Sequence, residues 1–304
     1  MAQPTLIVIT GPTASGKSAL AVSLAKKLNA EIISADSRQI YKGIPIVTAV
    51  PSLDEREGVK HHLLEILALE DYYSAARFEE DASKILSSLF KENDYAIVCG
   101  GSMLYIDALI NGIDLLPTVP EDIRTNLSNE WKLKGDAWLL NQLSNLDPVY
   151  FNKVDLKNLK RVFHAVEVSI TAGQPYSSLL TGNNRLKGLP YNIKKFCLDG
   201  PRPLLFERIN KRTENMMEMG LEEEAKRVYP LRHLNSLNTV GLKEMFMMFE
   251  GIFSREEAIA RIQKNTRVYA KKQLTWHKRD PYLNYLDFST PISINVEKIL
   301  QTLL

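Results

Sequence analysis

A short segment near the amino terminus has the residue types and spacing of a phosphate site. Residues 11–18 read GPTASGKS, directly follow the apolar run LIVIT, and match the pattern G-x-x-x-x-G-K-[ST] in full. In such a loop, backbone N–H groups point at phosphate oxygens, the lysine neutralises charge, and the final hydroxyl can coordinate Mg²⁺. We predict that this segment binds the phosphates of a nucleotide or another diphosphate, with Ser18 as a metal ligand. Its residues are Gly11, Pro12, Thr13, Ala14, Ser15, Gly16, Lys17 and Ser18.

Two later segments also follow apolar runs and carry groups that can act on a substrate. In SADSRQIYKG, Asp36 can ligate a metal or accept a proton, or it can serve as a helix cap or Asx turn. The Gln39 amide can bind an adenine edge through N6 and N7. In the segment GGS at 100–102, the glycines permit a close backbone approach, and Ser102 can position a substrate or cap a helix.

Basic side chains recur at helical spacing in the last third of the chain. Arg208 and Arg212 are four residues apart, so they share one face of a helix predicted to begin near Pro203. Beside a phosphate site they can neutralise developing charge; otherwise they form an exposed, solvated pair. A second helix, starting at a capping box from Ser254 to Glu257, carries a stripe that suits a polyphosphate backbone or is a solvated face. This basic stripe consists of Arg261, Lys264, Arg267 and Lys271.

These segments require a scaffold that brings them together. The first hundred residues alternate short apolar runs with helical patterns, such as a strand at 6–10 followed by a helix at 18–28. This alternation predicts a parallel sheet with helices on both faces. Because ligands bind beyond the carboxyl ends of parallel strands, we expect the loops at 11–18, 36–41 and 100–105 to converge on one crevice.

The pattern changes at residue 117. Helical periodicity without a convincing strand extends through RVFHAVEVSI and is followed by loop-like sequence through TGNNRLKGLPYN, before strand character returns at KKFCLDG. We therefore predict an α/β protein with a P-loop NTPase-like parallel sheet core, formed by residues 1–116 and 190–304. Residues 117–189 are predicted to form a helical insertion domain.

The composition excludes several classes of protein. Apolar residues make up 45% and charged residues 24% of the 304 positions, which is ordinary for a globular protein. The net charge of +2 means that any basic surface must be local. The two cysteines, Cys99 and Cys197, are too few for a disulfide scaffold and indicate buried thiols in a reducing compartment. No signal-length or membrane-length apolar run is present, so we expect a cytoplasmic protein without a membrane partner.

Taken together, the motifs resemble one enzyme family. The chain is similar to the bacterial tRNA dimethylallyltransferases (IPP transferase family), which prenylate N6 of adenosine 37 beside the anticodon of tRNA. The resemblance covers nearly the whole chain, including the helical insertion, and its segments occur in the family's order. They are GPTASGKS, SADSRQIYKG, AVPS, HHLLEI, YSAARF, VCGGSMLYIDALINGID, RVFHAVEV, the arginine helix and NTRVYAKKQLTW.

The resemblance implies a reaction in which the diphosphate leaves rather than being passed on. The loop would hold the diphosphate of dimethylallyl diphosphate with Lys17 and Mg²⁺, and Asp36 would be the base for the adenine amine. Ser102 would lie in the site where relatives often carry Thr, and Arg208 would match an arginine that binds diphosphate. The partners would be dimethylallyl diphosphate and the anticodon stem-loop of tRNA, bound by a monomer.

The resemblance and the basic stripe also imply tRNA contacts. The expected contact residues are Asp36, Ser37, Arg38, Gln39, Ser102, Arg124, Lys160, Arg161, Val162, Phe163, His164, Leu237, Asn238, Thr239, Val240, Gly241, Leu242, Arg267 and Lys271. Three positions depart from the family pattern: His164 replaces a common arginine, Leu242 a common tyrosine and Val50 a common lysine. These departures bear on how tRNA docks and not on the diphosphate site.

Three other functions share part of this pattern. A P-loop small-molecule kinase shares the fold and loop but gives no reason for the DS-x-Q and GG-S segments. A relative that prenylates free adenine nucleotides shares the chemistry but does not need a tRNA-contacting insertion. An RNA-binding protein with a decayed site is at odds with the intact Lys17, Ser18, Asp36 and Arg208.

Overall fold

The computed structural model describes residues 3–114, 116–180 and 188–303. The loop expected at 181–192 therefore falls partly outside the described residues, at 181–187. The chain divides into two compact units, Met1–Ile110 with Leu186–Leu304, and Asn111–Arg185. The insertion boundaries expected from sequence, 117 and 189, lie slightly carboxyl-terminal to those of the second unit. Each unit is described by itself below.

The first unit is built on a six-stranded sheet in the order β3-β2-β4-β1-β5-β6, in which every pairing is parallel. Leu6, Ile7, Val8 and Ile9 of the central strand are all at most 1% exposed, as expected for a parallel strand covered on both faces. This confirms the predicted parallel α/β core. The strands are β1 (Thr5–Thr10), β2 (Ile32–Ser34), β3 (His61–His62), β4 (Tyr95–Cys99), β5 (Asn192–Asp199) and β6 (Asn284–Asp287).

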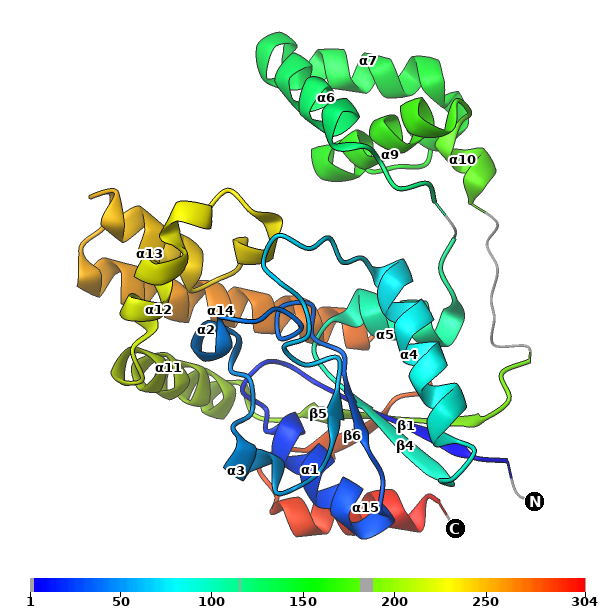
Figure 1. Ribbon diagram of the computed structural model, residues 1–304, viewed down its shortest axis with the longest axis vertical. Coiled ribbons are helices and arrows are strands. Elements are labelled where there is room, and N and C mark those ends of the chain that lie inside the picture. Colours follow the sequence, from blue (N-terminus) through cyan, green and yellow to red (C-terminus); the bar gives the residue numbers. More distant parts are fainter. Residues whose placement is uncertain (1–2, 115, 181–187, 304) are drawn as a thin grey trace. The chain divides into compact units, whose positions relative to one another are not determined.

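Helices cover both faces of this sheet. Helices α1 and α15 lie on one side of it, and α4 and α5 lie on the other (Figure 1). The large core cluster joins α1 to the sheet and also takes in Leu205 and Ile209 of α11 and Ala270 and Leu274 of α14. The longer helices of this unit are α1 (Lys17–Leu28), α4 (Ala75–Leu89), α5 (Met103–Asn111), α11 (Arg202–Glu218), α12 (Leu221–Val228), α13 (Leu242–Phe249), α14 (Arg255–His277) and α15 (Ile292–Gln301). Its short helical turns are α2 (Pro45–Thr48), α3 (Leu53–Arg56), η1 (Tyr229–Leu231) and η2 (Asn235–Leu237).

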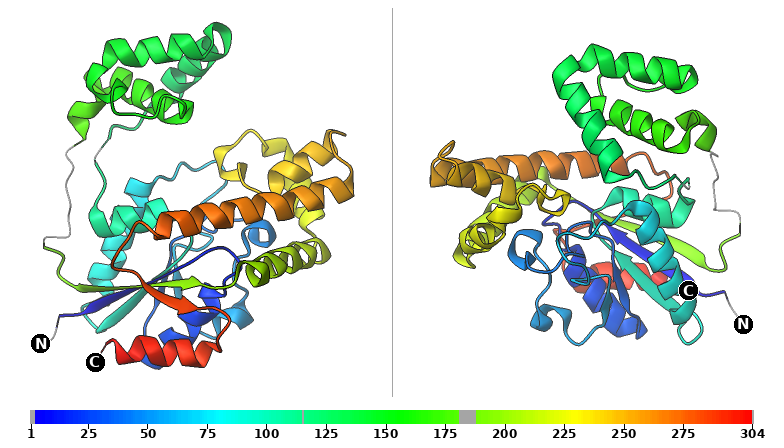
Figure 2. Two further views of the ribbon diagram at one scale, coloured as in Figure 1. Left: turned by 180° about the vertical axis from the view of Figure 1, so that it is seen from behind. Right: turned by 45° about the horizontal axis from the view of Figure 1, so that its top comes forward.

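Helix α14 is the longest helix of the described chain. It starts at the predicted capping box, where the Ser254 hydroxyl accepts from Glu257 N and the Glu257 carboxylate accepts from Ser254 N. It runs above the sheet and beside α11, and α13 packs on its amino-terminal half (Figure 2). The long helix therefore connects the sheet to the α11–α13 layer.

The second unit is helical, without a strand among its described residues. Its helices are α6 (Glu121–Lys134), α7 (Asp136–Leu146), α8 (Pro148–Phe151), α9 (Leu159–Ala172) and α10 (Tyr176–Leu179). They enclose a core of their own, centred on Leu139 and Leu143 of α7 and on Val162 and Val166 of α9. The buried Asp147 carboxylate caps α8 through Tyr150 N and also accepts from Ser177 N, which ties α8 to α10.

Some elements of the core were not expected from sequence. Strands β3 and β6 are two and four residues long, so neither shows a recognisable alternation.

Cys99 and Cys197 are free and buried, as predicted. No helix in the part of the chain that the structure describes is long and apolar enough to cross a membrane.

Candidate active site

A cavity of about 380 Å³ opens in the first unit, beyond the carboxyl ends of its central strands. The phosphate loop contributes Thr13, Lys17 and Ser18, and the segment after β2 contributes Asp36 to Gln39. Gly100 and Gly101 follow β4, while α11, α14 and the segment Asn238–Gly241 form the remaining walls. The predicted convergence of three loops on one crevice is therefore observed, in agreement with the rule for parallel sheets.

The phosphate loop wraps around the amino terminus of α1. Gly16 precedes the helix with φ +89°, a left-handed conformation that side chains disfavour, and its carbonyl accepts from Leu20 N at 3.1 Å. Lys17 curls back so that its ammonium donates to Pro12 O at 3.2 Å. The loop thus presents a helix amino terminus and an ammonium group to the cavity, the arrangement that binds phosphate.

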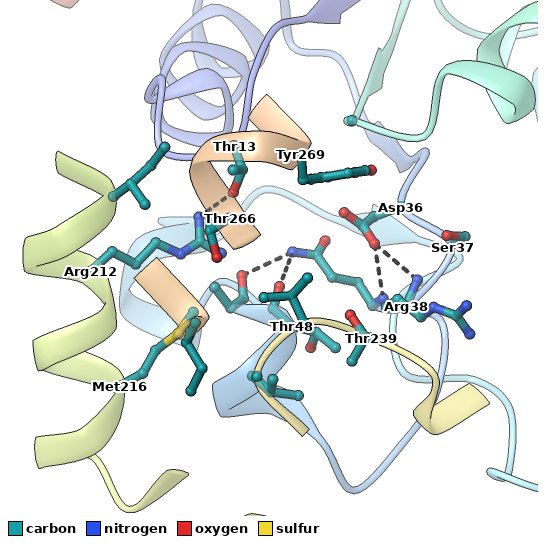
Figure 3. Close-up of a pocket in the computed structure, with 18 of the residues that line it drawn as sticks. Thr13, Asp36, Ser37, Arg38, Thr48, Arg212, Met216, Thr239, Thr266 and Tyr269 are labelled. Atoms are coloured by element: carbon teal, nitrogen blue, oxygen red, sulfur yellow. Dashed lines mark hydrogen bonds between the residues drawn. The ribbon is translucent and has the colours of Figure 1, made fainter. Parts of the chain in front are cut away.

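A second buried cation faces this loop from α11. Arg212 donates to Thr13 Oγ1 at 3.3 Å and reaches from α11 towards the phosphate loop (Figure 3). Burial lowers the pKa of Lys17, and the positive charge of Arg212 lowers it further. Burial likewise lowers the pKa of Arg212. Two cations that are costly to bury together favour an anionic ligand between them.

Asp36 forms a turn at the edge of the same cavity. Its Oδ1 accepts from Arg38 N at 2.9 Å and Gln39 N at 3.4 Å, which is the Asx turn considered from sequence. Its other oxygen is turned away from these amides, and the Tyr269 ring lies close by (Figure 3). The positive charges of Lys17 and Arg212 both interact with Asp36.

Gln39 is held by the protein backbone. Its amide nitrogen donates to Thr48 O and Ala49 O, at 3.1 and 2.9 Å, and its amide oxygen accepts from Ser34 Oγ at 3.2 Å. Both N–H groups of this amide are therefore engaged. An adenine edge would have to displace them in order to be read by Gln39.

Ser102 supports the turn at Asp36 and does not line the cavity itself. Its hydroxyl accepts from Ser37 N at 2.8 Å, and its own N–H donates to Ala35 O at 3.1 Å. Two residues before it, a Cβ on Gly100 would lie 2.0 Å from Ala35 O, so only glycine permits this approach. The Ser102 hydroxyl therefore supports the turn at Asp36 in this structure, and its positioning of a substrate stays a prediction.

The segment after η2 closes the cavity from a third side. The Arg38 guanidinium donates to Asn235 O at 2.7 Å and to Ser236 O at 3.1 Å, which joins η2, directly before this segment, to the turn at Asp36. Among the residues expected to contact tRNA here, Asn238, Thr239, Val240 and Gly241 line the cavity. Leu237 and Leu242 are at most 1% exposed, so their side chains hold the segment in place and do not line the cavity.

Arg208 lies outside this cavity. It lines a smaller hollow with Ser15, Gly16 and Phe288, where its guanidinium donates to Phe288 O at 3.3 Å. Its guanidinium carbon also lies 4.9 Å from the centre of the Phe288 ring. The two arginines are four residues apart, yet only Arg212 reaches the cavity that holds Lys17 and Asp36. The structure therefore favours Arg212, rather than Arg208, as the arginine of this cavity.

The basic stripe on α14 is partly engaged by aromatic and polar neighbours. Arg267 donates to Asn210 Oδ1 of α11 at 2.6 Å, and Lys271 lies 5.4 Å from the centre of the Phe206 ring. Arg261 lies 4.0 Å from the centre of the Phe253 ring. The exposed Lys271 keeps its ammonium accessible, whereas Arg267 also has a role in packing α14 on α11.

The remaining expected tRNA contacts lie in the second unit. Glu167, whose side chain is 4% exposed, accepts from Arg124 at 2.9 and 3.1 Å and is bonded to His164 Nδ1 at 2.9 Å. Lys160 and Arg161 are exposed, and Phe163 packs 5.5 Å from the Trp131 ring. The Val162 side chain is fully buried in the core of this unit, so any contact with tRNA there would have to come from its backbone.

The residues of the cavity can contribute to a metal site without forming one alone. Among the residues that the structure describes, no group of three His, Cys, Asp or Glu side chains could hold a metal ion. Ser18 and Asp36, a hydroxyl and a carboxylate, line the same cavity. These oxygen ligands suit Mg²⁺, which in phosphate sites takes few protein ligands and relies on the substrate phosphates and water.

Sequence reasoning missed several residues of the cavity. Thr266 and Gln273 lie on the inner side of α14; both fall in the segment NTRVYAKKQLTW that carries the family resemblance, but only basic residues of this helix were assigned a role. The apolar wall formed by Val47, Ile209, Met216 and Ile262 comes from three separate elements and has no motif. Such a wall can be found only once the fold has brought its elements together.

Comparison with known proteins gives consistent results. The IPP transferase family model matches residues 39–280. A tRNA dimethylallyltransferase of Azobacteroides pseudotrichonymphae is 47% identical over 280 residues, which are 92% of this chain and 91% of that protein. The solved tRNA isopentenylpyrophosphate transferase of Bacillus halodurans superposes with a TM-score of 0.73 at 32% identity, covering 99% of this chain and 96% of that chain. A solved eukaryotic dimethylallyltransferase acting on tRNA superposes with a TM-score of 0.79 at 26% identity, covering 94% of this chain and 74% of that chain.

Proposed function

Since the chain belongs to the IPP transferase family, we propose that it transfers a dimethylallyl group from dimethylallyl diphosphate to N6 of adenosine 37 in tRNA, with release of diphosphate. The observation that carries the proposal is the cavity in which Lys17 and Arg212 face the turn at Asp36. It combines a site for an anionic leaving group with a carboxylate able to accept a proton. A kinase shares the phosphate loop and can also use a carboxylate base, so the acceptor experiment below has to separate the two reactions.

The two cations would act on the leaving group. In the proposed step, the bond between the allylic carbon and the diphosphate oxygen breaks while a bond forms between that carbon and adenine N6. Negative charge then grows on the diphosphate, where the Lys17 ammonium and the Arg212 guanidinium would stabilise it. Interactions that strengthen as the bond breaks lower the barrier, and buried cations interact more strongly than solvated ones.

Asp36 would accept the proton that N6 must lose. The nitrogen is positively charged after attack, and a carboxylate within hydrogen-bond reach can remove its proton and orient the amine beforehand. Because Oδ1 is held by Arg38 N and Gln39 N, the second oxygen is the one available to substrate. The neighbouring apolar residues Val47, Ile209 and Ile262 line the same cavity and suit a branched hydrocarbon chain.

We propose that Mg²⁺ assists this reaction, held by Ser18 and by the diphosphate itself. When bound, it supplies charge neutralisation to the leaving diphosphate. The tRNA contacts are assigned to residues that are at least partly exposed, chiefly Arg124, Lys160, Arg161 and His164 in one unit and Arg38 and Lys271 in the other. A target base must leave its stack to enter a cavity of this kind.

We place the activity in the cytoplasm, where tRNA serves translation, and propose that the protein acts as a monomer.

The test is a labelling experiment with several acceptors. The protein is incubated with Mg²⁺ and labelled dimethylallyl diphosphate, together with unmodified tRNA, AMP or ATP, and the products are digested and identified. Label at N6 of adenosine 37 is expected only with tRNA. A matched tRNA carrying guanosine at position 37 should remain unlabelled, and Lys17→Ala should abolish turnover while tRNA binding survives.

Other outcomes would point to the alternatives. Label in AMP or ATP but not in tRNA would assign the chain to prenylation of free nucleotides. Phosphate transfer from ATP without prenylation would indicate a kinase. Tight tRNA binding without transfer to any acceptor would leave an RNA-binding protein.

A further inference from the structure

We propose that Gln273 is a positioning residue that holds the phosphate loop and the turn at Asp36 at a fixed separation. This inference rests on the proposed function for its chemical meaning and on the hydrogen bonds of one buried amide for its geometry. Gln273 lies on α14, lines the cavity and is 1% exposed. It falls in the segment NTRVYAKKQLTW that carries the family resemblance, but the sequence analysis gave it no role in the reaction.

Both ends of the amide are bonded to active-site backbone. The oxygen accepts from Thr13 N at 2.9 Å, in the phosphate loop, and the nitrogen donates to Gly101 O at 3.0 Å, in the loop after β4. A Cβ on Gly101 would lie 2.5 Å from this nitrogen and 3.7 Å from Lys17 Cε, so the amide occupies the space beside the lysine. One side chain therefore joins the loops that follow β1 and β4.

The connection continues from Gly101 to both neighbours of Asp36. Ser102, the next residue, donates from its N–H to Ala35 O at 3.1 Å and accepts from Ser37 N at 2.8 Å. The path from Thr13 through Gln273 and Ser102 thus ends on the two residues that flank the proposed base. Thr13 is also bonded to Arg212, so the cationic side of the cavity is part of the same network.

This connection has a chemical consequence. In the proposed reaction the diphosphate is fixed by the phosphate loop and the amine by Asp36, so the distance between nucleophile and electrophile depends on the distance between the two loops. A displacement of about 1 Å in such a geometry can lower a rate by as much as a hundredfold. Substrate binding to either loop alone does not depend on the separation. Gln273 should therefore affect turnover more than affinity.

The decisive variant is Gln273→Met, which keeps the length of the side chain but removes the donor and the acceptor. At saturating dimethylallyl diphosphate and tRNA, we expect the single-turnover rate to fall about tenfold or more, with the KM for tRNA unchanged. Hydrogen exchange of a peptide containing Thr13 should accelerate, because its amide loses the partner on α14. Gln263→Met on the same helix is the matched control and should match the wild type in both measurements.

A second variant keeps the inference testable if Gln273→Met does not fold. Gln273→Glu keeps an acceptor for Thr13 N but replaces the donor to Gly101 O by an oxygen, so it should slow turnover even if Gln273→Met does not fold. A wild-type rate in a folded Gln273 variant would overturn the inference, as would unchanged exchange at Thr13 in Gln273→Met. If the wild type itself transfers no dimethylallyl group, the proposed function fails, while the exchange measurement still decides whether Gln273 holds the loop.

Discussion

At the scale of single residues, one carboxylate oxygen of Asp36 is bonded within a turn and the other faces the cavity. The sequence left open whether this carboxylate caps a turn or takes part in chemistry. Its Oδ1 caps the turn through Arg38 N and Gln39 N, yet its other oxygen faces a cavity that contains Lys17 and Arg212. One side chain can fulfil both roles because a carboxylate has two oxygens, each able to accept independently.

This division between the two oxygens makes Asp36→Asn informative. The asparagine oxygen can still accept from Arg38 N, so we expect the fold and diphosphate binding to persist, whereas the proton acceptor is lost. The single-turnover rate at saturating substrates should fall by about a hundredfold or more, the usual scale for loss of a general base. Rapid-quench measurement of prenylated tRNA checks this, and a wild-type rate would remove Asp36 from the mechanism.

The two arginines of α11 provide a matched pair. Arg212 lies in the cavity with Lys17, while Arg208 lies outside it against Phe288. We expect Arg212→Gln to lower turnover by about a hundredfold, because charge on the leaving diphosphate loses a buried donor. Arg208→Gln should stay within a few-fold of the wild type. Single-turnover rates of the two variants decide the assignment, and the reverse order would restore Arg208 as the diphosphate-binding arginine.

At the scale of elements, α14 contributes to the site on one face and to the protein surface on the other. Its inner residues Ala270, Gln273 and Leu274 are at most 7% exposed, while Lys271 is exposed. Sequence analysis identified the outer face because positive charges at helical spacing are conspicuous. It quoted the segment NTRVYAKKQLTW that contains Gln273 but gave this residue no role, because the role depends on the phosphate loop and Gly101 being placed beside the amide.

The outer face of α14 makes a prediction about salt. If Lys271 contacts a tRNA phosphate, Lys271→Ala should lower the slope of log affinity against log salt concentration by about 0.7 to 0.9, through loss of one released counterion. Turnover at saturating tRNA should be unchanged. Lys298→Ala on α15, another exposed lysine, is the control and should keep the wild-type slope. An unchanged slope in Lys271→Ala would make this part of the stripe a solvated face.

At the scale of the whole molecule, the architecture followed from local sequence patterns, whereas the packing of individual side chains did not. The phosphate loop, the parallel core and the long basic helix follow from local patterns in apolar runs, glycines and caps. The exclusion of Arg208 from the cavity and the burial of Val162, Leu237 and Leu242 depend on how helices rotate when they pack. Helical spacing places two side chains on one face, but tertiary packing decides what that face meets.

Packing around His277 gives the molecule a pH dependence that can be measured. This side chain, at the end of α14, is 5% exposed and lies 3.2 Å from Thr10 Oγ1 at the end of β1. Burial lowers its pKa from 6.5 to about 4, and the positive charge of Lys17 contributes in the same direction, against the opposing effect of Asp199 and Asp280. At a pH between these two pKa values, His277 carries a proton in the unfolded chain but not in the folded chain.

The free energy of unfolding should therefore decrease as the pH falls from about 6.5 to 4, with His277 contributing on the order of 3 kcal/mol to the loss. The lowered pKa of His61 acts in the same direction, so the contribution of His277 has to be isolated by difference. We expect denaturant unfolding of His277→Gln to show a smaller loss between pH 7 and pH 4.5 than that of the wild type. His233→Gln, at an exposed histidine, should retain the full loss. If His277→Gln lost as much stability as the wild type over this range, the pKa of His277 would not differ between the folded and the unfolded chain, and burial at the end of β1 would not be the cause of the pH dependence.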